Sequence, residues 1–519
     1  MSSAPEPPGE RVARVMPAIG IPQRAWIALA AIALAALVAG LVCASDGSGP
    51  ADAATRLVPA SALVYVHLST DPAREPDARL ARLAGALPPV RALRKRIVDA
   101  VSPHAFDLER DVRPWLGAEL AYAAVSPRDP LVLAAVADLR KAEALVARVG
   151  NLSASKHYRG VRVLSAGPTA LAFVGEFLAL GSEAAVHAAI DRDAGDGEAL
   201  ADLPGYRRAA EGRPAARSLD AYASADGVRD VLAARDGLLG ALGALLDRPG
   251  LSAAGASLTA EQDGLRAHVR LVGGAPRDAA FEPLLLEQVP EEASAYFGVR
   301  NALRLMRALG RLGIERPVAQ LGERLASEAG IDLDRDLLAP LSGELALAVT
   351  SAAGTPVVTI KAHTADQRRT ESALARLQQP VARRLAMPGT VPAFEVVPLG
   401  ELNAFTLSVT PALAPSYAIA DGTLVLSTSR AGLEPPRGTL AAARAFEATV
   451  GELPAEADSL VFLDLRALSA LAEQTGLTAI PGLATARDEL DRVRAAGAVV
   501  AEDRDHPSDT TAELFLEIP

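Results

Sequence analysis

Asp107-Leu-Glu-Arg-Asp-Val-Arg-Pro-Trp-Leu-Gly-Ala-Glu-Leu-Ala121 recurs later in the chain as Asp332-Leu-Asp-Arg-Asp-Leu-Leu-Ala-Pro-Leu-Ser-Gly-Glu-Leu-Ala346. Eight of the fifteen aligned pairs are identical, and the alignment needs no gap. Such a dense match within one chain indicates an internal duplication, because repeated structural units appear in a sequence as self-similarity. The match therefore predicts two related folded units, although it identifies no chemistry.

The flanking sequence extends this match over most of the chain. Val58-Pro59 and Val289-Pro290 each precede an apolar stretch, and proline suits the first position of a strand because no ladder N–H is needed there. Helical and strand patterns then alternate in the same order in both halves, and each half closes with a predicted hairpin. The predicted repeats span residues 56–276 and 277–519.

Each predicted repeat is assigned to the α+β class, with an antiparallel sheet and helices packed on it. Apolar and polar residues alternate in His268-Val-Arg-Leu-Val272 and Glu513-Leu-Phe-Leu-Glu517, which favours strands with one buried face. We expect a strand over residues 158–165 and long helices over 228–246 and 467–494. The order of the strands in the sheet does not follow from these patterns.

An uncharged stretch near the N-terminus predicts a membrane anchor. Residues 25–45 carry no charge, and about 20 apolar residues in a helix match the roughly 30 Å hydrocarbon thickness of a bilayer. Trp26 suits an interfacial position, and the arginines before the stretch place the N-terminus in the cytoplasm. We predict a disordered cytoplasmic tail (1–24), a single transmembrane helix in the lipid bilayer (25–45), a linker (46–55) and an extracytoplasmic remainder.

The stretch has three alternative interpretations. A cleaved signal peptide has small residues near Val42-Cys43-Ala44, but the apolar run exceeds the roughly 7–15 residues of a typical signal core. Lipidation of Cys43 is disfavoured because Val42 stands where a lipoprotein signal has a small residue. A buried core helix fits poorly with the abrupt polar linker over 46–52. A retained anchor is therefore preferred.

The composition excludes several classes of function. Cys43 is the only cysteine, so the predicted extracytoplasmic part has no disulfide, Cys-x-x-Cys pair or cysteine-zinc site. A net charge of -11 disfavours nucleic acid as a partner. Aromatic residues make up only 4% of the chain, so extended stacking platforms for bases or sugars are not expected.

Three stretches carry a family resemblance: Leu57-Val-Pro-Ala-Ser-Ala-Leu-Val-Tyr-Val-His-Leu68, Asp111-Val-Arg-Pro-Trp-Leu-Gly117 and Tyr158-Arg-Gly-Val161. They resemble a bacterial family catalogued only as a domain of unknown function, the one numbered 3352. The resemblance covers most of residues 56–519 and weakens in the second half, where the Trp-Leu pair is replaced by Pro340-Leu341. It implies a single-pass anchored protein with a large extracytoplasmic region, and it carries over no catalytic residue.

Two acidic stretches raise the question of a cation site. Asp332-x-Asp-x-Asp336 resembles the start of a calcium loop, but Leu337 stands where the loop needs glycine and Gly343 where it needs glutamate. Carboxylates at the start of a helix also satisfy its free N–H groups, and we favour this capping role. Asp191-Arg-Asp-Ala-Gly-Asp-Gly-Glu198 is interpreted as a solvated loop.

The remaining patterns predict no chemistry. Ser153-Ala-Ser-Lys156 has the spacing of a serine nucleophile and its lysine, but the partner motifs of penicillin-recognising enzymes are absent. The glycine run over 237–243 lacks the Lys-Ser/Thr of a phosphate loop. The seven histidines have no paired metal-binding spacing, and His67 is expected to be half-exposed on its strand. We therefore predict no catalytic residue, no cofactor and no metal site.

These observations predict a non-catalytic protein that acts by binding or scaffolding at the bacterial cell envelope, with an envelope protein as its partner. A carrier or sensor of an apolar ligand such as a lipid is one alternative, since the many Leu, Val and Ala residues permit a cavity. A cryptic hydrolase that pairs a serine with His157 or His187 is another.

Overall fold

The structure is a computed structural model that describes residues 49–71, 73–86, 108–149, 154–232, 249–274, 280–302, 315–386, 392–399, 402–410, 413–451, 453–475 and 493–518. The predicted tail and the predicted membrane-spanning helix both lie outside these residues. Among the described residues, none of the helices has the length and apolar character needed to cross a bilayer. The described chain divides into two compact units, the first from Ala51–Asp71 and 108–203 and the second mainly from 73–86 and 204–518.

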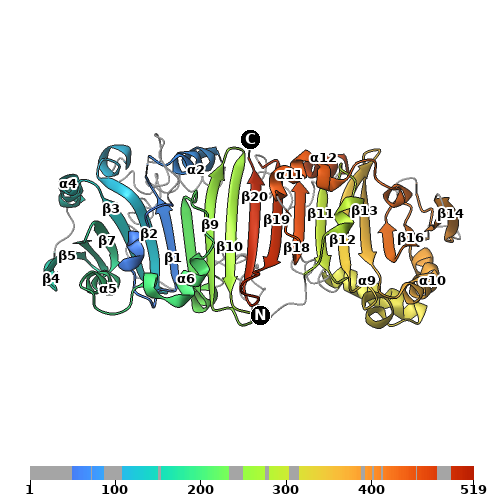
Figure 1. Cartoon of the computed structure of the whole chain (residues 1–519), viewed down its shortest axis with the longest axis horizontal. Coiled ribbons are helices and arrows are strands. Elements are labelled where there is room, and N and C mark those ends of the chain that lie inside the picture. The colour runs from blue at the N-terminus through green and yellow to red at the C-terminus, as the bar shows by residue number, and fades with distance from the viewer. Residues whose placement is uncertain are drawn as a thin grey trace, which may run out of the picture. The chain divides into compact units, whose positions relative to one another are not determined.

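The first unit is an antiparallel sheet with helices around it (Figure 1). Its strands are β1 (Val64–Ser69), β2 (Leu116–Ser126), β3 (Asp129–Val136), β4 (Ala154–Tyr158), β5 (Val161–Ala166), β6 (Thr169–Val174) and β7 (Phe177–Ser182). Its helical elements are η1 (Ala53–Arg56), η3 (Leu108–Val112), α4 (Leu139–Val149), α5 (Glu183–Asp193) and η4 (Leu200–Asp202). Neighbouring strands follow the order β1-β2-β3-β7-β6-β5-β4. Helix α5 packs across β3, β6 and β7, and β7 is buried along nearly its whole length.

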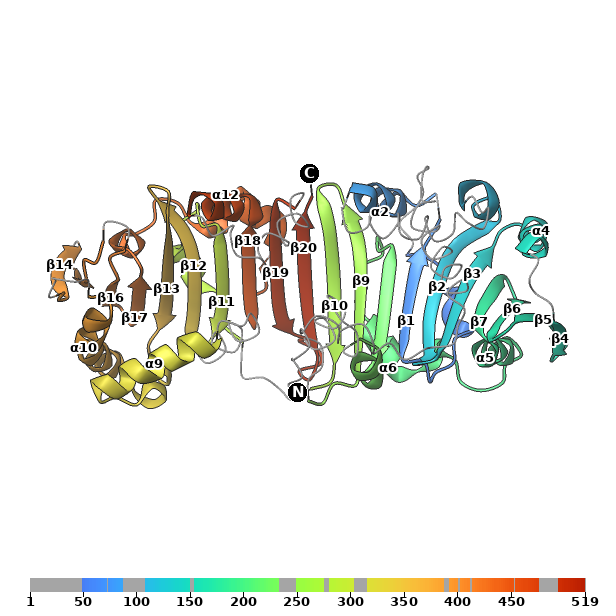
Figure 2. The same ribbon diagram turned by 180° about the vertical axis from the view of Figure 1, so that it is seen from behind.

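The second unit contains a larger antiparallel sheet (Figures 1 and 2). Its strands are β8 (Leu219–Ser224), β9 (Ala253–Glu261), β10 (Gly264–Val272), β11 (Ala295–Arg300), β12 (Glu344–Ala352), β13 (Thr355–His363), β14 (Glu395–Leu399), β15 (Leu402–Thr406), β16 (Ser416–Ala420), β17 (Thr423–Ser427), β18 (Ser459–Asp464), β19 (Ala495–Glu502) and β20 (Thr510–Glu517). They lie in the order β8-β9-β10-β20-β19-β18-β11-β12-β13-β17-β16-β15-β14.

Helical elements of the second unit pack along this sheet. They are α2 (Glu75–Ala86), α6 (Pro204–Ala210), η5 (Gly227–Leu232), η6 (Leu284–Gln288), α9 (Glu315–Ala329), η7 (Asp334–Leu338), α10 (Gln367–Arg384), η8 (Arg430–Leu433), η9 (Leu440–Ala442), α11 (Arg444–Val450) and α12 (Leu465–Thr475). Helix α6 contacts β8, β9 and β10, and α11 contacts β18, β19 and β20. The buried core under α11 is built around Tyr296, Phe446 and Phe462.

Strands β10 and β20 bring distant parts of the chain into one ladder, and Figures 1 and 2 show them side by side. Their register runs from Gly264 opposite Glu517 to Leu271 opposite Thr510. Each also pairs on its other side, β10 with β9 and β20 with β19, so neither is an exposed edge. A Cβ on Gly264 would stand 2.1 Å from the Leu516 carbonyl oxygen, so glycine permits the close approach. We call this ladder the seam.

A buried ion-pair network lies at the end of the seam where β10 finishes. Arg270 Nη2 is 2.7 Å from a carboxylate oxygen of Asp503, and Arg208 Nε is 2.7 Å from Asp509 Oδ2. The Gly273 N–H donates to the other Asp509 oxygen at 3.0 Å. Burial alone would raise the pKa of Asp509, but the Gly273 and Arg208 donors outweigh it and hold that pKa below its usual value. The network ties the 503–509 loop to α6 and β10.

Two short helices in this unit pack directly on glycines of the sheet. Under α6, a Cβ on Gly255 of β9 would stand 2.1 Å from the Ala209 carbonyl oxygen. Under α11, a Cβ on Gly497 of β19 would stand 2.7 Å from the Thr449 carbonyl oxygen. An edge-to-face aromatic pair joins each helix to the strand beside that glycine: Tyr206 with Tyr222 at 5.4 Å between ring centroids, and Phe446 with Phe462 at 5.5 Å.

The predicted α+β class with antiparallel sheet and helices is confirmed. One predicted strand is wrong: residues 158–165 contain the turn between β4 and β5. Arg159 and Gly160 both have positive φ, 49° and 83°, which is the geometry of a two-residue hairpin turn of type I′. Arginine rarely adopts this conformation, so the residue types at this position do not indicate a turn.

Two long helices were expected in regions that the structure describes only in part. The first corresponds to the single turn η5 and the second to α12, while 233–246 and 476–492 lie outside the described residues. The second prediction runs too far, because 493–494 are not helical. The division into compact units falls inside the first predicted repeat. The repeat boundary near residue 276 therefore stays a prediction.

We expect Gly255→Ala and Gly497→Ala to lower the melting temperature of the full-length chain. Either new Cβ would meet a helix carbonyl group at less than contact distance, and overpacking of this kind costs roughly 1–3 kcal/mol. Gly205→Ala, within α6, is the control because its Cβ would have neighbours only at 3.9 Å. Thermal unfolding followed by circular dichroism should separate the two glycines from the control, and equal melting temperatures would contradict this packing.

Candidate functional site

Two buried glutamates hold the N-termini of short helices. Glu119 of β2 accepts the N–H groups of Ala53 and Ala54 at 3.2 Å each. Glu344 of β12 accepts the N–H of Leu285 at 2.9 Å. These amides begin η1 and η6, where free N–H groups and the helix dipole favour a carboxylate. The Glu-Leu-Ala that ends both matched stretches therefore places a carboxylate under a short helix in each unit.

The pKa of the Glu344 carboxyl group is strongly shifted by its surroundings. Only 5% of the residue is exposed, and burial raises the pKa of its carboxyl group to about 7, although the N–H groups of Leu285 and Leu284 oppose the shift. The neighbouring Tyr296 is also buried, and burial together with the Glu344 charge raises the pKa of its hydroxyl group. Glu344 is therefore a group whose protonation changes near neutral pH.

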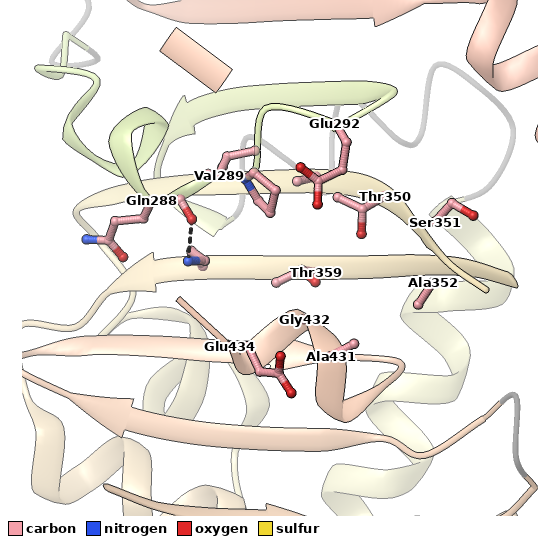
Figure 3. Close-up of a pocket in the computed structure, with 14 residues that line it drawn as sticks. Gln288, Val289, Glu292, Thr350, Ser351, Ala352, Thr359, Ala431, Gly432 and Glu434 are labelled. Atoms are coloured by element: carbon pink, nitrogen blue, oxygen red, sulfur yellow. Dashed lines mark hydrogen bonds between the residues drawn. The ribbon is translucent and has the colours of Figure 1, made fainter. Parts of the chain in front are cut away.

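A small cavity of about 80 Å³ lies beside β12 and β13 (Figure 3). Lys361 on β13 lines it, and its Nζ donates to the Gln288 carbonyl oxygen at 2.7 Å. Burial lowers the pKa of Lys361 to about 8. The carboxylates of Glu292 and Glu434 also line the cavity. Organic-ligand pockets usually measure about 300–1,000 Å³, so this cavity has room only for a few water molecules.

A larger cavity, about 710 Å³, lies at the opposite end of the seam from the ion-pair network. Its size falls within the range of ligand pockets. Helix α11, the short β9–β10 turn and the end of β20 form its walls. The charged lining residues are Glu261, Asp263, Arg444, Arg494 and Glu517, and the large apolar ones are Phe515 and Ile518. We call it the seam cavity.

The two ends of the seam differ because the two hairpin turns differ in length. The β19–β20 turn is the long 503–509 loop, and it reaches Arg208 of α6 through Asp509. The β9–β10 turn consists of 262–263 alone, and α11 presents Ala448 toward the seam cavity. The long loop fills one end with ion pairs, and the short turn leaves the other end hollow.

In the acidic stretch that resembles a calcium loop, the carboxylates of Asp332 and Asp336 are bonded to groups of the protein itself. Asp332 Oδ1 accepts the Arg335 N–H at 2.9 Å, as a helix-capping carboxylate does. Asp336 pairs with Arg335 at 2.9 Å and with Arg369 at 3.2 Å. The hydrogen bond from Arg335 is the largest of several contacts that lower the pKa of Asp336. In the first matched stretch, Asp111 pairs with Arg148 at 2.9 Å.

In the described parts of the other acidic stretch and of the Ser-x-x-Lys pattern, the charged side chains form ion pairs within the protein. Arg159 lies 2.6 Å from Asp191 and pairs with Asp196 as well. Lys156 is exposed on β4 rather than on a helix, and it lies 3.6 Å from Glu183. Ser153 and the glycine run over 237–243 lie outside the described residues.

The position of His67 differs from the one predicted from the sequence, and the other two candidate histidines lie in different surroundings. His67 was expected to be half-exposed, and this is wrong: its side chain is completely buried, with Nε2 3.5 Å from Glu119 Oε2. His187 instead stacks on Tyr158 with ring centroids 3.9 Å apart, and His157 stands opposite Arg162 in the β4–β5 hairpin. Within the described residues, no serine hydroxyl is hydrogen-bonded to His157 or His187.

Sequence reasoning missed both the seam cavity and the grouping of His67 with Glu119. The cavity depends on pairing between distant hairpins, which no local pattern reveals. For His67, one clue was available: it shares its strand with Tyr65, while the matching Tyr296 strand has Gly298 at the same position. A polar residue on a strand whose aligned counterpart has glycine at that position is a candidate for a special role.

Comparisons with known proteins identify the family but no activity. The model of the family described as "Protein of unknown function (DUF3352)" matches residues 25–518, so the chain belongs to that family. No curated protein matches the chain. Among solved structures, crystal forms I and IV of TP0453 match with 12% and 11% identity. These matches cover 44% and 43% of this chain and 82% and 80% of TP0453, each with a TM-score of 0.27.

Glu344 is predicted to make stability fall as the pH rises from about 4.5 to about 7. In this window the folded chain keeps a proton that the unfolded chain has lost, so ionisation favours unfolding. A shift of this size corresponds to about 3 kcal/mol. Glu344→Gln should flatten the melting temperature over this pH range, whereas Glu287→Gln, at an exposed position of η6, should leave the slope unchanged. Identical pH slopes in wild type and Glu344→Gln would refute the assignment.

Proposed function

We propose that this family member is a single-pass, membrane-anchored extracytoplasmic protein that acts by binding or scaffolding at the cell envelope, without catalysis of its own. The uncharged stretch over 25–45 would be the anchor, and the duplicated region would face the outside. The observation that carries the binding role is the seam cavity, which has the volume of a ligand site and a charged lining.

Internal duplication of the extracytoplasmic region is part of this proposal. The strand order β1-β2-β3-β7-β6-β5-β4 in the first unit has the same connectivity as β11-β12-β13-β17-β16-β15-β14 in the second. The buried Glu119 and Glu344 make the same contact with a short helix. The glycine contacts and aromatic pairs under α6 and α11 also correspond. Common ancestry accounts for all of these likenesses together.

The chemistry of the seam cavity favours a polar, charged occupant over an apolar one. Arg444 of α11 and Arg494 contribute guanidinium groups, and Arg494 lies 3.7 Å from Glu517. Burying such groups against a lipid chain would remove their hydration without replacing it. Phe515 gives one apolar contact surface, already covered in part by the Arg266 guanidinium at 4.7 Å from its ring centroid. A segment of an envelope protein suits this lining better than a lipid does.

Membrane topology provides the first test. A reporter that is active only outside the cytoplasm should be active when fused after residue 519, and a cytoplasmic reporter at the same place should be inactive. Deleting 25–45 should move the chain from the membrane fraction into the cytosol, whereas deleting 2–24 should leave it in the membrane. Cytoplasmic activity of the C-terminal fusion would contradict the proposed orientation.

Photo-crosslinking from the seam cavity provides the second test. A photoreactive residue in place of Ala448, which lines the cavity, should give one discrete adduct with an envelope protein in intact cells. The matched control is the exposed neighbour Glu447 on the same helix, which is not part of the lining. Adding Arg444→Glu to the Ala448 variant should reduce the adduct several-fold. Equal adducts from 447 and 448, insensitive to Arg444→Glu, would contradict binding at this cavity.

A further inference from the structure

We infer that Asp52, His67 and Glu119 form a binding site for a divalent transition-metal ion, with Zn²⁺ as the best match. One ligand atom from each residue lies within 4.8 Å of the other two. His67 Nε2 and Glu119 Oε2 are 3.5 Å apart. All three residues belong to the first unit, and they come from the start of η1, from β1 and from β2.

The spacing of these atoms suits a shared ion. Two ligands about 2.1 Å from a tetrahedral Zn²⁺ stand about 3.4 Å from each other, close to the 3.5 Å between His67 Nε2 and Glu119 Oε2. A direct N–H···O hydrogen bond would bring those atoms to about 2.7–3.2 Å. The separation therefore fits two ligands of one ion better than a hydrogen-bonded pair.

Neighbouring donors orient both carboxylates toward this point. The Tyr65 hydroxyl donates to Asp52 Oδ1 at 2.5 Å, and the N–H groups of Ala53 and Ala54 hold Glu119. Each carboxylate oxygen has two lone pairs, so these bonds leave acceptor capacity for a metal. Outer hydrogen bonds of this kind fix ligands in real metal sites. His67 and Glu119 are buried, whereas Asp52 is half-buried and gives the ion a route from solvent.

The second unit shows what this part of the fold looks like without the additional ligands. There Glu344 holds a short helix as Glu119 does. Gly298 stands opposite Ala346 just as His67 stands opposite Ala121, and Pro283 precedes η6 where Asp52 precedes η1. The contact between carboxylate and helix therefore forms without histidine or aspartate. Asp52 and His67 are therefore not required for the helix contact, and both offer ligand atoms to a shared ion.

The donor set narrows the choice of ion. Zn²⁺ and its transition-metal neighbours bind imidazole nitrogen as well as carboxylate oxygen, whereas Ca²⁺ and Mg²⁺ prefer oxygen ligands only. Three protein ligands leave a fourth tetrahedral position for water. The site would tie η1, which begins within the predicted linker (46–55), to strands β1 and β2.

Zinc titration of the purified full-length chain, with any affinity tag removed, tests this inference. We expect one Zn²⁺ per chain by elemental analysis and saturable binding in competition with a chromophoric chelator. His67→Gln and Asp52→Asn should each weaken binding by at least about tenfold, and Tyr65→Phe should weaken it by about tenfold through loss of the bond that orients Asp52. His187→Gln, a histidine stacked on Tyr158 in the same unit, should bind as wild type does.

A thermal readout guards against variants that fail to fold. At one fixed Zn²⁺ concentration, the rise in melting temperature should be the same for wild type and His187→Gln and clearly smaller for Asp52→Asn, since stabilisation by a ligand falls as its dissociation constant rises. Asp52 is half-buried, so this variant is expected to fold. Absence of saturable Zn²⁺ binding by the folded wild type would overturn the inference, as would equal affinity in wild type, His67→Gln and Asp52→Asn. An ion pair between protonated His67 and Glu119 would then account for their distance.

Discussion

The pairing of β10 with β20 is the interaction on which the second unit depends. Without it, each hairpin would present an unpaired edge of N–H and C=O groups, a risk that β proteins avoid. The ladder joins residues 264–271 to 510–517, so two distant hairpins become one sheet. Bringing such distant segments together costs loop-closure entropy. The buried contacts of Asp509 with Arg208 and Gly273 help to offset this cost.

Because the two hairpin turns differ in length, the two ends of the seam differ in structure. The 503–509 loop is long enough to carry Asp509 to α6, and that end of the seam is filled by charge pairs. The 262–263 turn is too short for an equivalent contact, and the seam cavity results. Glu119 and Glu344 also differ in their surroundings: Glu119 has His67 and Asp52 beside it, whereas Glu344 stands against Tyr296.

Much of this fold was predictable because it rests on local patterns. The alternation around His268 and Glu513 predicted the strands that form the seam, whereas the burial of Glu119 and Glu344 inside the matched stretches became apparent only in the structure. The turn at Arg159 was not predictable from residue type, since the left-handed conformation is uncommon for arginine. Burial of His67 and the existence of the seam cavity depend on contacts between distant segments, which periodicity does not encode. The membrane anchor stays a prediction, because residues 25–45 lie outside the described structure.

Hydrogen exchange of the full-length chain, followed by mass spectrometry, tests the seam most directly. Backbone amides paired on both sides exchange only through opening of the sheet, whereas edge amides exchange readily. Peptides covering 264–272 and 510–517 should be protected as strongly as the central strand β12, and far more than the edge strand β14. Exchange of both peptides at the rate of β14 would contradict the account, because β10 and β20 would then be two free edges.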